Sequence, residues 1–233
     1  MPDTPETAAP PTDPAADLWA HGHADLGPLF DRASSARLAA LFPEDALFRS
    51  HIVMRRHGFG EGAYKYFADP LPEEIAAARA ELYARLVPVA TAWERALGTG
   101  RVFPPTHAAF RAECHAQGQT RPTPLLLRYG PGDYNCLHQD LYGPLVFPIQ
   151  VVVLLSDPVS FEGGEFVLTE QRPRMQRRVE VVSLRQGHAH AFAVADRPKE
   201  GSRGFYRLRQ RHGVSRLRRG TRLTLGIIFH DAA

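Results

Sequence analysis

The stretch from Pro122 to the C-terminus alternates short apolar runs with Gly and Pro turns, and no helix-forming segment separates those runs. Val, Leu, Phe and Tyr dominate the runs, and these residue types favour strands. At least six successive strands without intervening helices predict an antiparallel sandwich or jelly roll. The expected strands are Pro124 to Tyr129, Val146 to Leu155, Glu165 to Leu168, Val179 to Leu184, His188 to Val194 and Arg222 to Phe229.

The N-terminal half follows a different pattern. Residues 1–16 are mostly Pro, Ala, Thr and Asp, with almost nothing large to bury, which predicts a disordered tail. Apolar residues at helical spacing follow, with one short strand among them, Ala46 to Arg55. The expected helices lie between Asp31 and Pro43, from Pro72 to Leu97 and from His107 to Gln117.

The fold class expected from these patterns is mainly β with an α annex. We expect a disordered tail over residues 1–16, a helical N-terminal annex over residues 17–121 and a catalytic β core over residues 122–233. With 233 residues, of which 44% are hydrophobic, the chain is long enough to bury one sizeable core.

Two observations bear on the compartment. The longest nearly apolar stretch, Pro144 to Leu155, is too short to span a bilayer, and residues 1–16 lack the basic start and apolar centre of a secretory signal. We therefore expect a cytoplasmic protein without a membrane partner. Cys114 and Cys136 are too few for a disulfide framework, and we expect both to be buried as small apolar residues.

Positive charge is concentrated in one segment. Residues 171–222 carry fourteen Arg and one Lys against Glu180, Asp196 and Glu200. A basic surface of this kind attracts phosphodiester backbones and other anions, although a solvated arginine-rich face without a ligand has the same composition. The charge distribution is therefore consistent with a nucleic-acid partner but does not require one.

One tripeptide carries the residue types of a metal site. In His138-Gln139-Asp140 the two ligand-type side chains stand at i and i+2, so on a strand or strand end they project from the same side. His212 comes 72 residues after Asp140, and Arg222 follows ten residues later. Two imidazoles and one carboxylate form the set that holds iron(II) on one face and leaves other positions open. A lone His-x-Asp is common in surface turns, but the distal His212 and the downstream Arg222 indicate that these residues act together in one site.

A longer pattern surrounds these residues. The segment Arg128-Tyr129-Gly130-Pro131-Gly132, followed by Leu137-His138-Gln139-Asp140, resembles the AlkB group of nucleic-acid demethylases, including the nine-residue step from Tyr129 to His138. The segment Phe161-Glu-Gly-Gly-Glu-Phe166 is similar to the prolyl-hydroxylase-like branch instead, as is the ten-residue step from His212 to Arg222. Both branches belong to the iron(II)- and 2-oxoglutarate-dependent dioxygenases. The pattern His212-Gly-Val-Ser-Arg216, with Leu225-Gly-Ile-Ile-Phe-His-Asp231, also resembles a group of bacterial oxygenases linked to damaged DNA.

The resemblance covers roughly residues 122–231. It implies a double-stranded β-helix core, also called a jelly-roll or cupin-like core, that uses iron(II), 2-oxoglutarate and O2. It also implies that His138, Asp140 and His212 are the catalytic metal ligands.

The resemblance further implies a set of contacts to 2-oxoglutarate. Arg222 matches the arginine that binds the far carboxylate, Thr224 matches a polar contact and Tyr129 matches a hydroxyl contact. Two positions depart from the AlkB pattern, because Leu127 and Ile228 stand where that group has an Asn and a second Arg. The resemblance therefore supports the reaction type more than the substrate.

Three functions remain open from the sequence. The first is an oxygenase that demethylates alkylated nucleic acid, single-stranded or damaged, which is a DNA-repair activity. The second applies the same chemistry to a protein side chain or a small molecule, which the Phe161 to Phe166 segment favours. The third is a non-catalytic cupin-like binding protein, in which the three ligand-type residues are coincidental. The sequence identifies neither the oxidised substrate nor the oligomeric state.

Other polar groups also invite a role. His188 and His190 alternate on an expected strand, and we interpret them as core or pocket-wall residues. His230-Asp231 lies near the end of the chain, where a solvated terminus is expected. Basic and aromatic residues interleave in a loop that either lies over the pocket and holds a base or phosphate, or faces solvent: Arg55, Arg56, His57, Tyr64, Lys65 and Tyr66.

Overall fold

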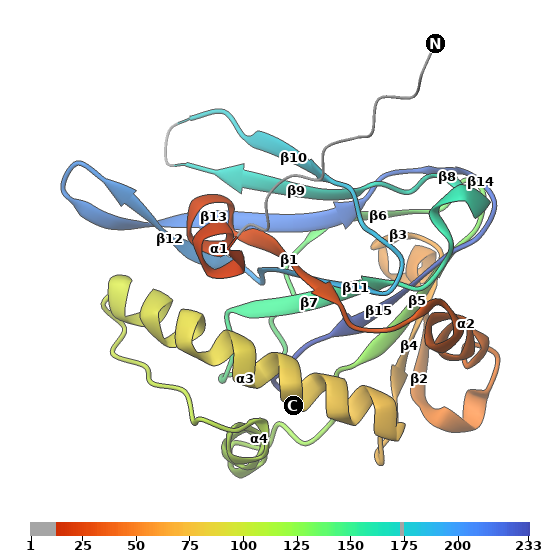
Figure 1. Ribbon diagram of the computed structural model, residues 1–233, viewed down its shortest axis with the longest axis horizontal. Helices are drawn as coiled ribbons and strands as arrows, with labels where there is room; N and C mark the ends of the chain where they lie inside the picture. Colours follow the sequence, from red (N-terminus) through yellow and green to blue (C-terminus); the bar gives the residue numbers. More distant parts are fainter. Residues whose placement is uncertain (1–12, 173–174) are drawn as a thin grey trace, which may run out of the picture.

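The computed structural model of the chain describes residues 13–172 and 175–233. Two antiparallel sheets lie face to face, and the helices α3 and α4 cover the outer face of the larger sheet (Figure 1). The larger sheet has seven strands in the order β1-β11-β7-β15-β5-β4-β2. The smaller has the order β10-β9-β13-β6-β3, with β12 paired to β13. This is the expected mainly β jelly-roll architecture.

The helices are α1 (Pro14–His21), α2 (Arg32–Ala40), α3 (Glu73–Ala96) and α4 (His107–Ala116), with 3-10 turns η1 (Asp45–Leu47), η2 (Met54–His57) and η3 (Pro158–Ser160). The strands of the N-terminal half are β1 (His23–Pro28), β2 (Phe48–Val53), β3 (Gly60–Glu61) and β4 (Ala63–Phe67). The remaining strands are β5 (Leu125–Tyr129), β6 (Tyr134–His138), β7 (Ile149–Leu154), β8 (Glu162–Gly163), β9 (Phe166–Gln171), β10 (Arg178–Val182), β11 (His188–Ala193), β12 (Asp196–Gly201), β13 (Gly204–Val214), β14 (Leu217–Arg219) and β15 (Arg222–Ile227).

Every strand expected in the C-terminal half is present, as β5, β7, β9, β10, β11 and β15. The β12–β13 hairpin was not expected, and His212 lies inside β13. Along β13 the buried Gln210 and His212 alternate with the outward Arg209 and Arg211. Because both faces of this part of the strand carry polar residues, the apolar alternation that reveals a strand is missing.

The N-terminal half holds more strands than the helical annex that we expected, in which Ala46 to Arg55 was the one strand and is present as β2. Strands β1, β2 and β4 from this half belong to the seven-stranded sheet, so the sheet continues across the expected boundary at residue 122. Strand β1 buries Ala24 and Leu26 on one face, while His23 and Asp25 on the other are half-buried. The alternation covers only His23 to Leu26 before Gly27 and Pro28, which is too short a signal to predict a strand.

The expected tail also differs at its end. Helix α1 begins at Pro14, because the Asp13 side chain accepts a hydrogen bond from the Ala15 amide at 2.9 Å and Pro suits the first turn of a helix. Residues 1–12, the rest of the expected tail, lie outside the described residues.

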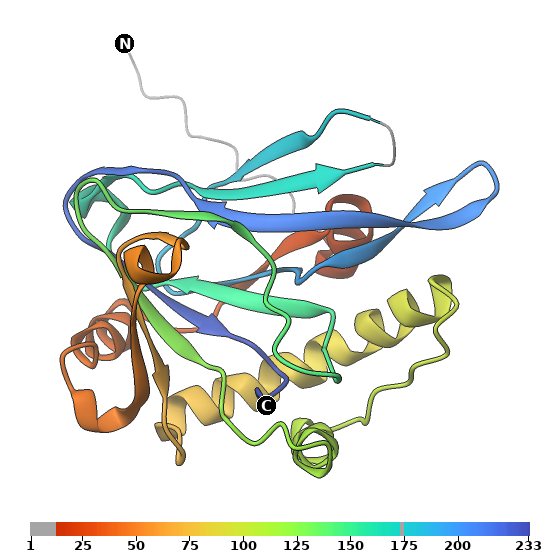
Figure 2. The same cartoon turned by 180° about the vertical axis from the view of Figure 1, so that it is seen from behind.

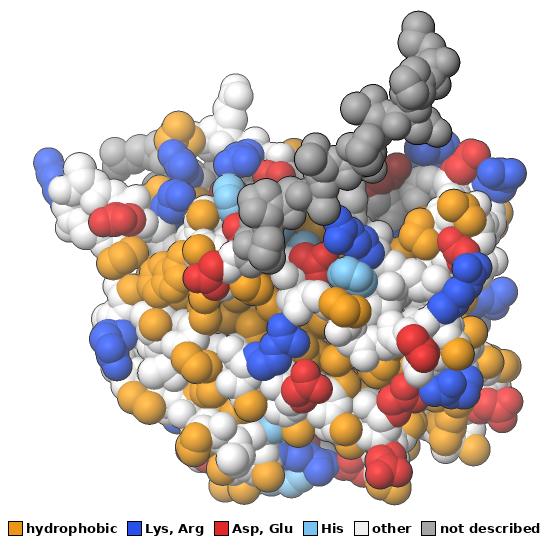
Figure 3. Space-filling view, viewed as in Figure 1, with side chains coloured by type: hydrophobic (Ala, Val, Ile, Leu, Met, Phe, Trp, Pro, Cys, Tyr) orange, Lys and Arg blue, Asp and Glu red, His pale blue; other side chains and the backbone are white. Residues whose placement is uncertain are grey.

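Strand β7 at the centre of the larger sheet is buried on both faces. Ile149, Val151 and Val153 pack in the main core cluster, which also contains Leu82, Leu86 and Trp93 of α3. Gln150 and Val152 face the space between the two sheets. Apolar side chains also gather on the surface where α1 and β12 approach the end of α3 (Figure 3). Trp19 of α1 contacts Trp93 and Phe205.

A buried charge cluster anchors the C-terminal segment. His230 and Asp231 are both fully buried, so the expected solvated terminus is wrong. The Arg79 guanidinium of α3 lies 2.8 Å from Asp231 and also donates to the Ile228 and Phe229 carbonyls. Arg111 of α4 reaches the second Asp231 carboxylate oxygen at 2.9 Å. These bonds fix the chain directly after β15, the strand that carries Arg222 and Thr224.

Replacing Asp231 by Asn should lower the free energy of unfolding by about 3 to 5 kcal/mol, because it leaves the buried Arg79 guanidinium without a counter-charge. Glu81→Gln is the matched control, since Glu81 forms only an exposed pair with Arg85 and should cost less than about 0.5 kcal/mol. Urea unfolding of both variants measures the difference. Equal small losses would contradict the anchoring role.

The pH dependence of stability gives a second prediction. Burial lowers the pKa of His107 and of His190 to about 4, from 6.5 in an exposed histidine. The unfolded chain therefore binds these protons more readily, and the stability present above about pH 6.5 is lost as the pH falls through 4. The loss should approach about 3 kcal/mol per histidine. His190→Gln should flatten this slope in urea unfolding measured from pH 7 to 4, and an unchanged slope would refute it.

Candidate metal centre and active site

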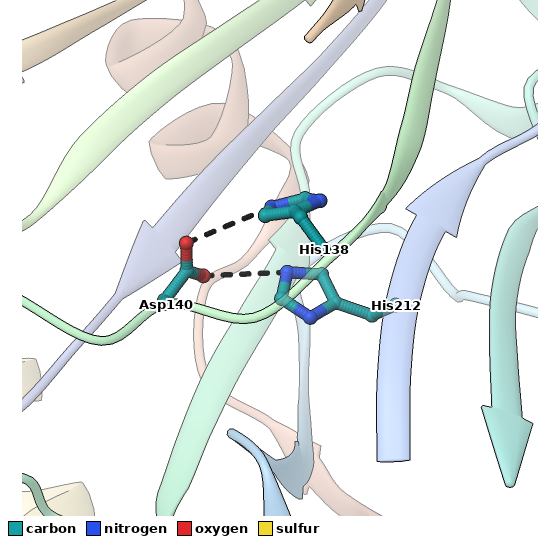
Figure 4. A group of neighbouring side chains, drawn as sticks. All are labelled: His138, Asp140 and His212. Carbon is teal, nitrogen blue, oxygen red and sulfur yellow. Dashed lines mark ion pairs between the residues drawn. The ribbon is translucent and has the colours of Figure 1, made fainter. Parts of the chain in front are cut away.

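The two histidines of the expected metal site are brought together by strand pairing. His138 ends β6, and His212 on the neighbouring strand β13 is its direct partner in register, with the ring centroids 4.1 Å apart. Asp140 follows β6 and turns its carboxylate to both rings (Figure 4). Its oxygens lie 3.6 Å from Nε2 of His138 and 3.3 Å from Nε2 of His212.

One potential ligand atom from each residue lies within 4.8 Å of the others. Asp140 and His212 are buried, while the His138 side chain is about a third exposed, so the group sits at the inner end of an opening. Within residues 13–172 and 175–233, no other cluster of three such side chains has this geometry.

The protonation states suit a divalent cation. Burial alone would raise the pKa of Asp140, but the hydrogen bond from His212 and the charges of both histidines hold that pKa well below its usual range. Burial lowers the pKa of His212. At neutral pH the carboxylate is therefore ionised and the His212 imidazole is neutral, which are the forms that bind metals.

Neighbouring groups orient the three side chains. Nδ1 of His138 donates to the Cys136 carbonyl at 2.8 Å, which orients the ring with Nε2 toward Asp140. Tyr142 donates its hydroxyl to one Asp140 oxygen, and the Gln150 amide donates to the other at 2.9 Å. Tyr66 in turn donates to the Tyr142 hydroxyl at 2.9 Å.

Sequence analysis missed Tyr142 and Gln150. Gln150 did leave a signal, because it is the single polar residue in the otherwise apolar strand Ile149–Leu154. A buried amide inside such a strand must find a partner, and here that partner is the Asp140 carboxylate.

The three side chains open onto a cavity of about 340 Å³ between the sheets. Arg222, Thr224 and Tyr129 line the same cavity, and each is at most 2% exposed. Arg222 and Tyr129 are direct partners across β15 and β5, with the guanidinium carbon 5.7 Å from the Tyr129 ring centre. The structure thus brings all the residues singled out for metal and co-substrate into one cavity.

Arg222 is a buried cation without an anionic partner. Burial lowers its pKa to about 10, so it remains charged at neutral pH. No carboxylate of the described residues lies within 4 Å of its guanidinium, although Arg79 and Arg197, equally buried, each have one. An unpaired buried cation is costly, and a carboxylate such as the far carboxylate of 2-oxoglutarate would supply the missing charge. The residues present therefore fit this co-substrate.

The Gly163-Gly164 turn explains the second sequence motif. A Cβ atom on Gly164 would lie 2.9 Å from Cδ of Arg222 and 2.9 Å from Leu217, and its φ of +66° also disfavours other residues. The glycine therefore lets the chain pass closely over the Arg222 side chain.

One wall of the cavity is aromatic and apolar. Tyr64, Tyr66 and Tyr142 form it together with Leu125, and so do Leu127 and Ile228, the two departures from the AlkB pattern. The residues of the expected basic and aromatic loop lie in three different environments. Its tyrosines line the cavity, Lys65 is buried against Asp45, and Arg55, Arg56 and His57 are exposed.

The remaining histidines and cysteines lie as follows. His190 is buried and contacts His23 at 3.1 Å, while His188 contacts Asp25 at 3.1 Å. Neither lines the cavity: His190 is a core residue, whereas His188 is half-buried at the edge of the sheet contact with β1. Cys114 is buried as expected, whereas Cys136 is exposed at the cavity, which corrects the expectation of burial.

The family Oxygenase-NA, described as "Oxygenase, catalysing oxidative methylation of damaged DNA", matches residues 62–232. The chain belongs to this oxygenase family. Two Mycobacterium tuberculosis proteins, Uncharacterized protein Rv2227 (strain H37Rv) and Uncharacterized protein MT2286 (strain CDC 1551), are each 49% identical to it over 172 residues, 73% of this chain and 74% of theirs. As a 2-oxoglutarate-dependent oxygenase, the chain uses iron(II), 2-oxoglutarate and O2, and the non-catalytic alternative falls away.

Solved oxygenase structures share the fold. A Pseudomonas putida prolyl-4-hydroxylase superimposes with a TM-score of 0.54 at 13% identity, covering 94% of this chain and 98% of that one. A Trichoplax adhaerens prolyl hydroxylase, solved with a hypoxia inducible factor peptide, gives 0.56 at 12% identity, covering 94% and 87%. Among the described residues, no helix combines the length and apolarity needed to cross a bilayer.

Replacing Gln150 by Leu should weaken binding of a divalent metal about 10- to 100-fold, because the Asp140 carboxylate loses the donor that orients it. Anaerobic titration with iron(II), followed calorimetrically, measures this without catalysis. Gln186→Leu is the matched control, since Gln186 is half-buried but bonds only the Leu155 carbonyl. Equal affinities for the two variants would show that Gln150 does not position the ligand.

Proposed function

We propose that this oxygenase hydroxylates the methyl group of an alkylated base in nucleic acid, which restores the base and releases formaldehyde. In this proposal His138, Asp140 and His212 hold the iron, and Arg222, Thr224 and Tyr129 hold the far carboxylate of 2-oxoglutarate. The observation that carries it is that one cavity holds both the metal-type cluster and a buried guanidinium that pairs with no carboxylate of the described residues. Iron(II) and 2-oxoglutarate, when bound, supply with O2 the oxidation of a C–H bond to C–OH, with succinate and carbon dioxide as co-products.

The residues around Arg222 suit a carboxylate. The planar guanidinium offers paired N–H donors, and the Thr224 hydroxyl lies two residues along the same strand. Burial raises the pKa of Tyr129 to about 12, so its phenol stays protonated and able to donate. Asn135 donates to the Tyr129 oxygen at 3.3 Å, which orients the phenol.

Several features support a base as the substrate. The family description names damaged DNA, and the cavity wall of Tyr64, Tyr66 and Tyr142 offers ring surfaces on which a planar base packs. Among the described residues that line the cavity, Asp140 alone carries a carboxylate that would repel a polyanion at its entrance.

Hydroxylation of a peptide or small molecule is the second candidate. The observation that favours it is the Gly163-Gly164 turn over Arg222, a motif that resembles the prolyl-hydroxylase-like branch. This candidate shares the metal and co-substrate residues of the first and differs only in what enters the cavity.

The deciding experiment measures succinate formed by iron-loaded protein with 2-oxoglutarate, with and without N-methylated single-stranded DNA. We expect succinate to rise with the methylated strand and formaldehyde to appear in equal amount. Succinate formation that does not depend on the DNA would support the oxygenase activity but contradict a nucleic-acid substrate. In the same assay Asp140→Ala should abolish turnover, and Arg222→Gln should raise the 2-oxoglutarate requirement roughly 10- to 100-fold.

A further inference from the structure

Three large apolar side chains remain exposed where the cavity opens. Phe59 is 46% exposed and Leu137 is 39% exposed, and both line the cavity. Leu141, 54% exposed, lies between the cavity residues Asp140 and Tyr142. Exposed apolar groups clustered at the entrance of a site indicate a surface that is covered during binding.

The turn that carries Phe59 is fixed to the strand that carries His138. The Cys136 amide donates to the Phe59 carbonyl at 2.9 Å, and Gly60 pairs with Asn135 of β6. A Cβ atom on Gly60 would lie 2.3 Å from the Tyr134 carbonyl oxygen, so only glycine allows this approach. In Figure 2 the orange η2 turn accordingly lies beside the green β6. Its position relative to the metal cluster is therefore set by backbone bonds.

The exposed groups on this turn are aromatic and basic. The His57 and Phe59 rings stack with centroids 5.3 Å apart and 21° between their planes. Arg55 and Arg56 on η2 are exposed, and within the described part of the chain Glu61, 3.4 Å from Arg55, is the one acidic residue paired with them. The turn thus combines a flat ring surface with an excess of positive charge.

We propose that this mouth surface, defined as Arg55, Arg56, His57, Phe59, Leu137 and Leu141, binds a single strand of nucleic acid beside the nucleotide whose base enters the cavity. The proposal rests on the proposed function and adds the place and form in which the strand is bound. Ring stacking holds bases of any sequence, and guanidinium groups hold phosphates. A single strand is favoured because its bases expose their faces to Phe59, whereas duplex bases are stacked on one another. The two arginines favour a polyanion over an apolar peptide.

The first test is binding of a fluorescent 12-nucleotide single strand to the full chain, followed by anisotropy, with DNA, RNA and duplex DNA of the same sequence. Phe59→Ala should weaken single-strand binding about tenfold or more, since one stacked base is lost. Phe205→Ala is the matched control, because Phe205 is also 46% exposed but lies on the β12–β13 hairpin and does not line the cavity. Thermal unfolding of both variants verifies that the fold is retained.

The second test uses salt. The double variant Arg55→Gln and Arg56→Gln should reduce the slope of log affinity against log salt by about 1.4, if each arginine contacts one phosphate of a single strand. Arg177→Gln with Arg178→Gln on the opposite sheet edge removes the same charge and should leave the slope nearly unchanged.

The outcomes separate the two proposals. Equal effects of Phe59→Ala and Phe205→Ala, or equal effects of the two arginine pairs, would overturn the mouth surface while leaving nucleic-acid oxidation intact. Tighter binding of the duplex than of the single strand would overturn the single-strand form. If the native chain binds no nucleic acid and its succinate production ignores DNA, both proposals fail and peptides become the substrates to test.

Discussion

The register between β6 and β13 is the constraint on which the site depends. His138 and His212 are direct partners across these strands, and Asp140 follows two residues after the first. Side chains alternate between the faces of a sheet, so a slip of one residue would turn His212 outward and put Arg211 or Gly213 in its place. The register is held on its other side by β9, whose Leu168 pairs with His212 and packs inside between the sheets. Burial of the apolar Leu168 on β9 thus helps to fix which side chain of β13 faces the metal cluster.

The buried cations outside the cavity are paired with carboxylates, whereas the buried cation in the cavity pairs with no carboxylate of the described residues. Lys65, Arg79 and Arg197 are buried cations, and each contacts a carboxylate of the chain. Arg222 is the exception among the buried cations of the described residues. Arg222 begins β15, and the Arg79–Asp231 cluster anchors the chain just beyond the other end of this strand to α3. The strand that carries the unpaired cation is therefore tied to the helical layer by a paired one.

The shared fold does not decide the substrate, because jelly-roll oxygenases of very low sequence identity superimpose over almost the whole chain. The features particular to this chain lie around the opening. Leu127 and Ile228 make the cavity wall apolar where the AlkB pattern has polar groups, and Tyr142 and Gln150 hold both oxygens of Asp140. The exposed Arg55 and Arg56 and the stacked rings of His57 and Phe59 lie at the opening, on a turn bonded to β6. We therefore expect the cavity wall and the mouth surface, rather than the metal cluster, to determine which substrate binds.

The sequence by itself determined the β core, the helices α2, α3 and α4, and the residues gathered in the cavity, because each left a local signal. Strand runs and helical periods are read over short windows, and His138-Gln139-Asp140 is a contiguous motif. Only the tertiary structure decided that β1, β2 and β4 complete the larger sheet, that Asp231 is buried, and that Gln150 and Tyr142 orient Asp140. These facts depend on partners far away in the chain: β1 pairs with β11, and Asp231 contacts Arg79. A polar residue with a distant buried partner looks the same in sequence as one that faces water, and packing alone distinguishes them.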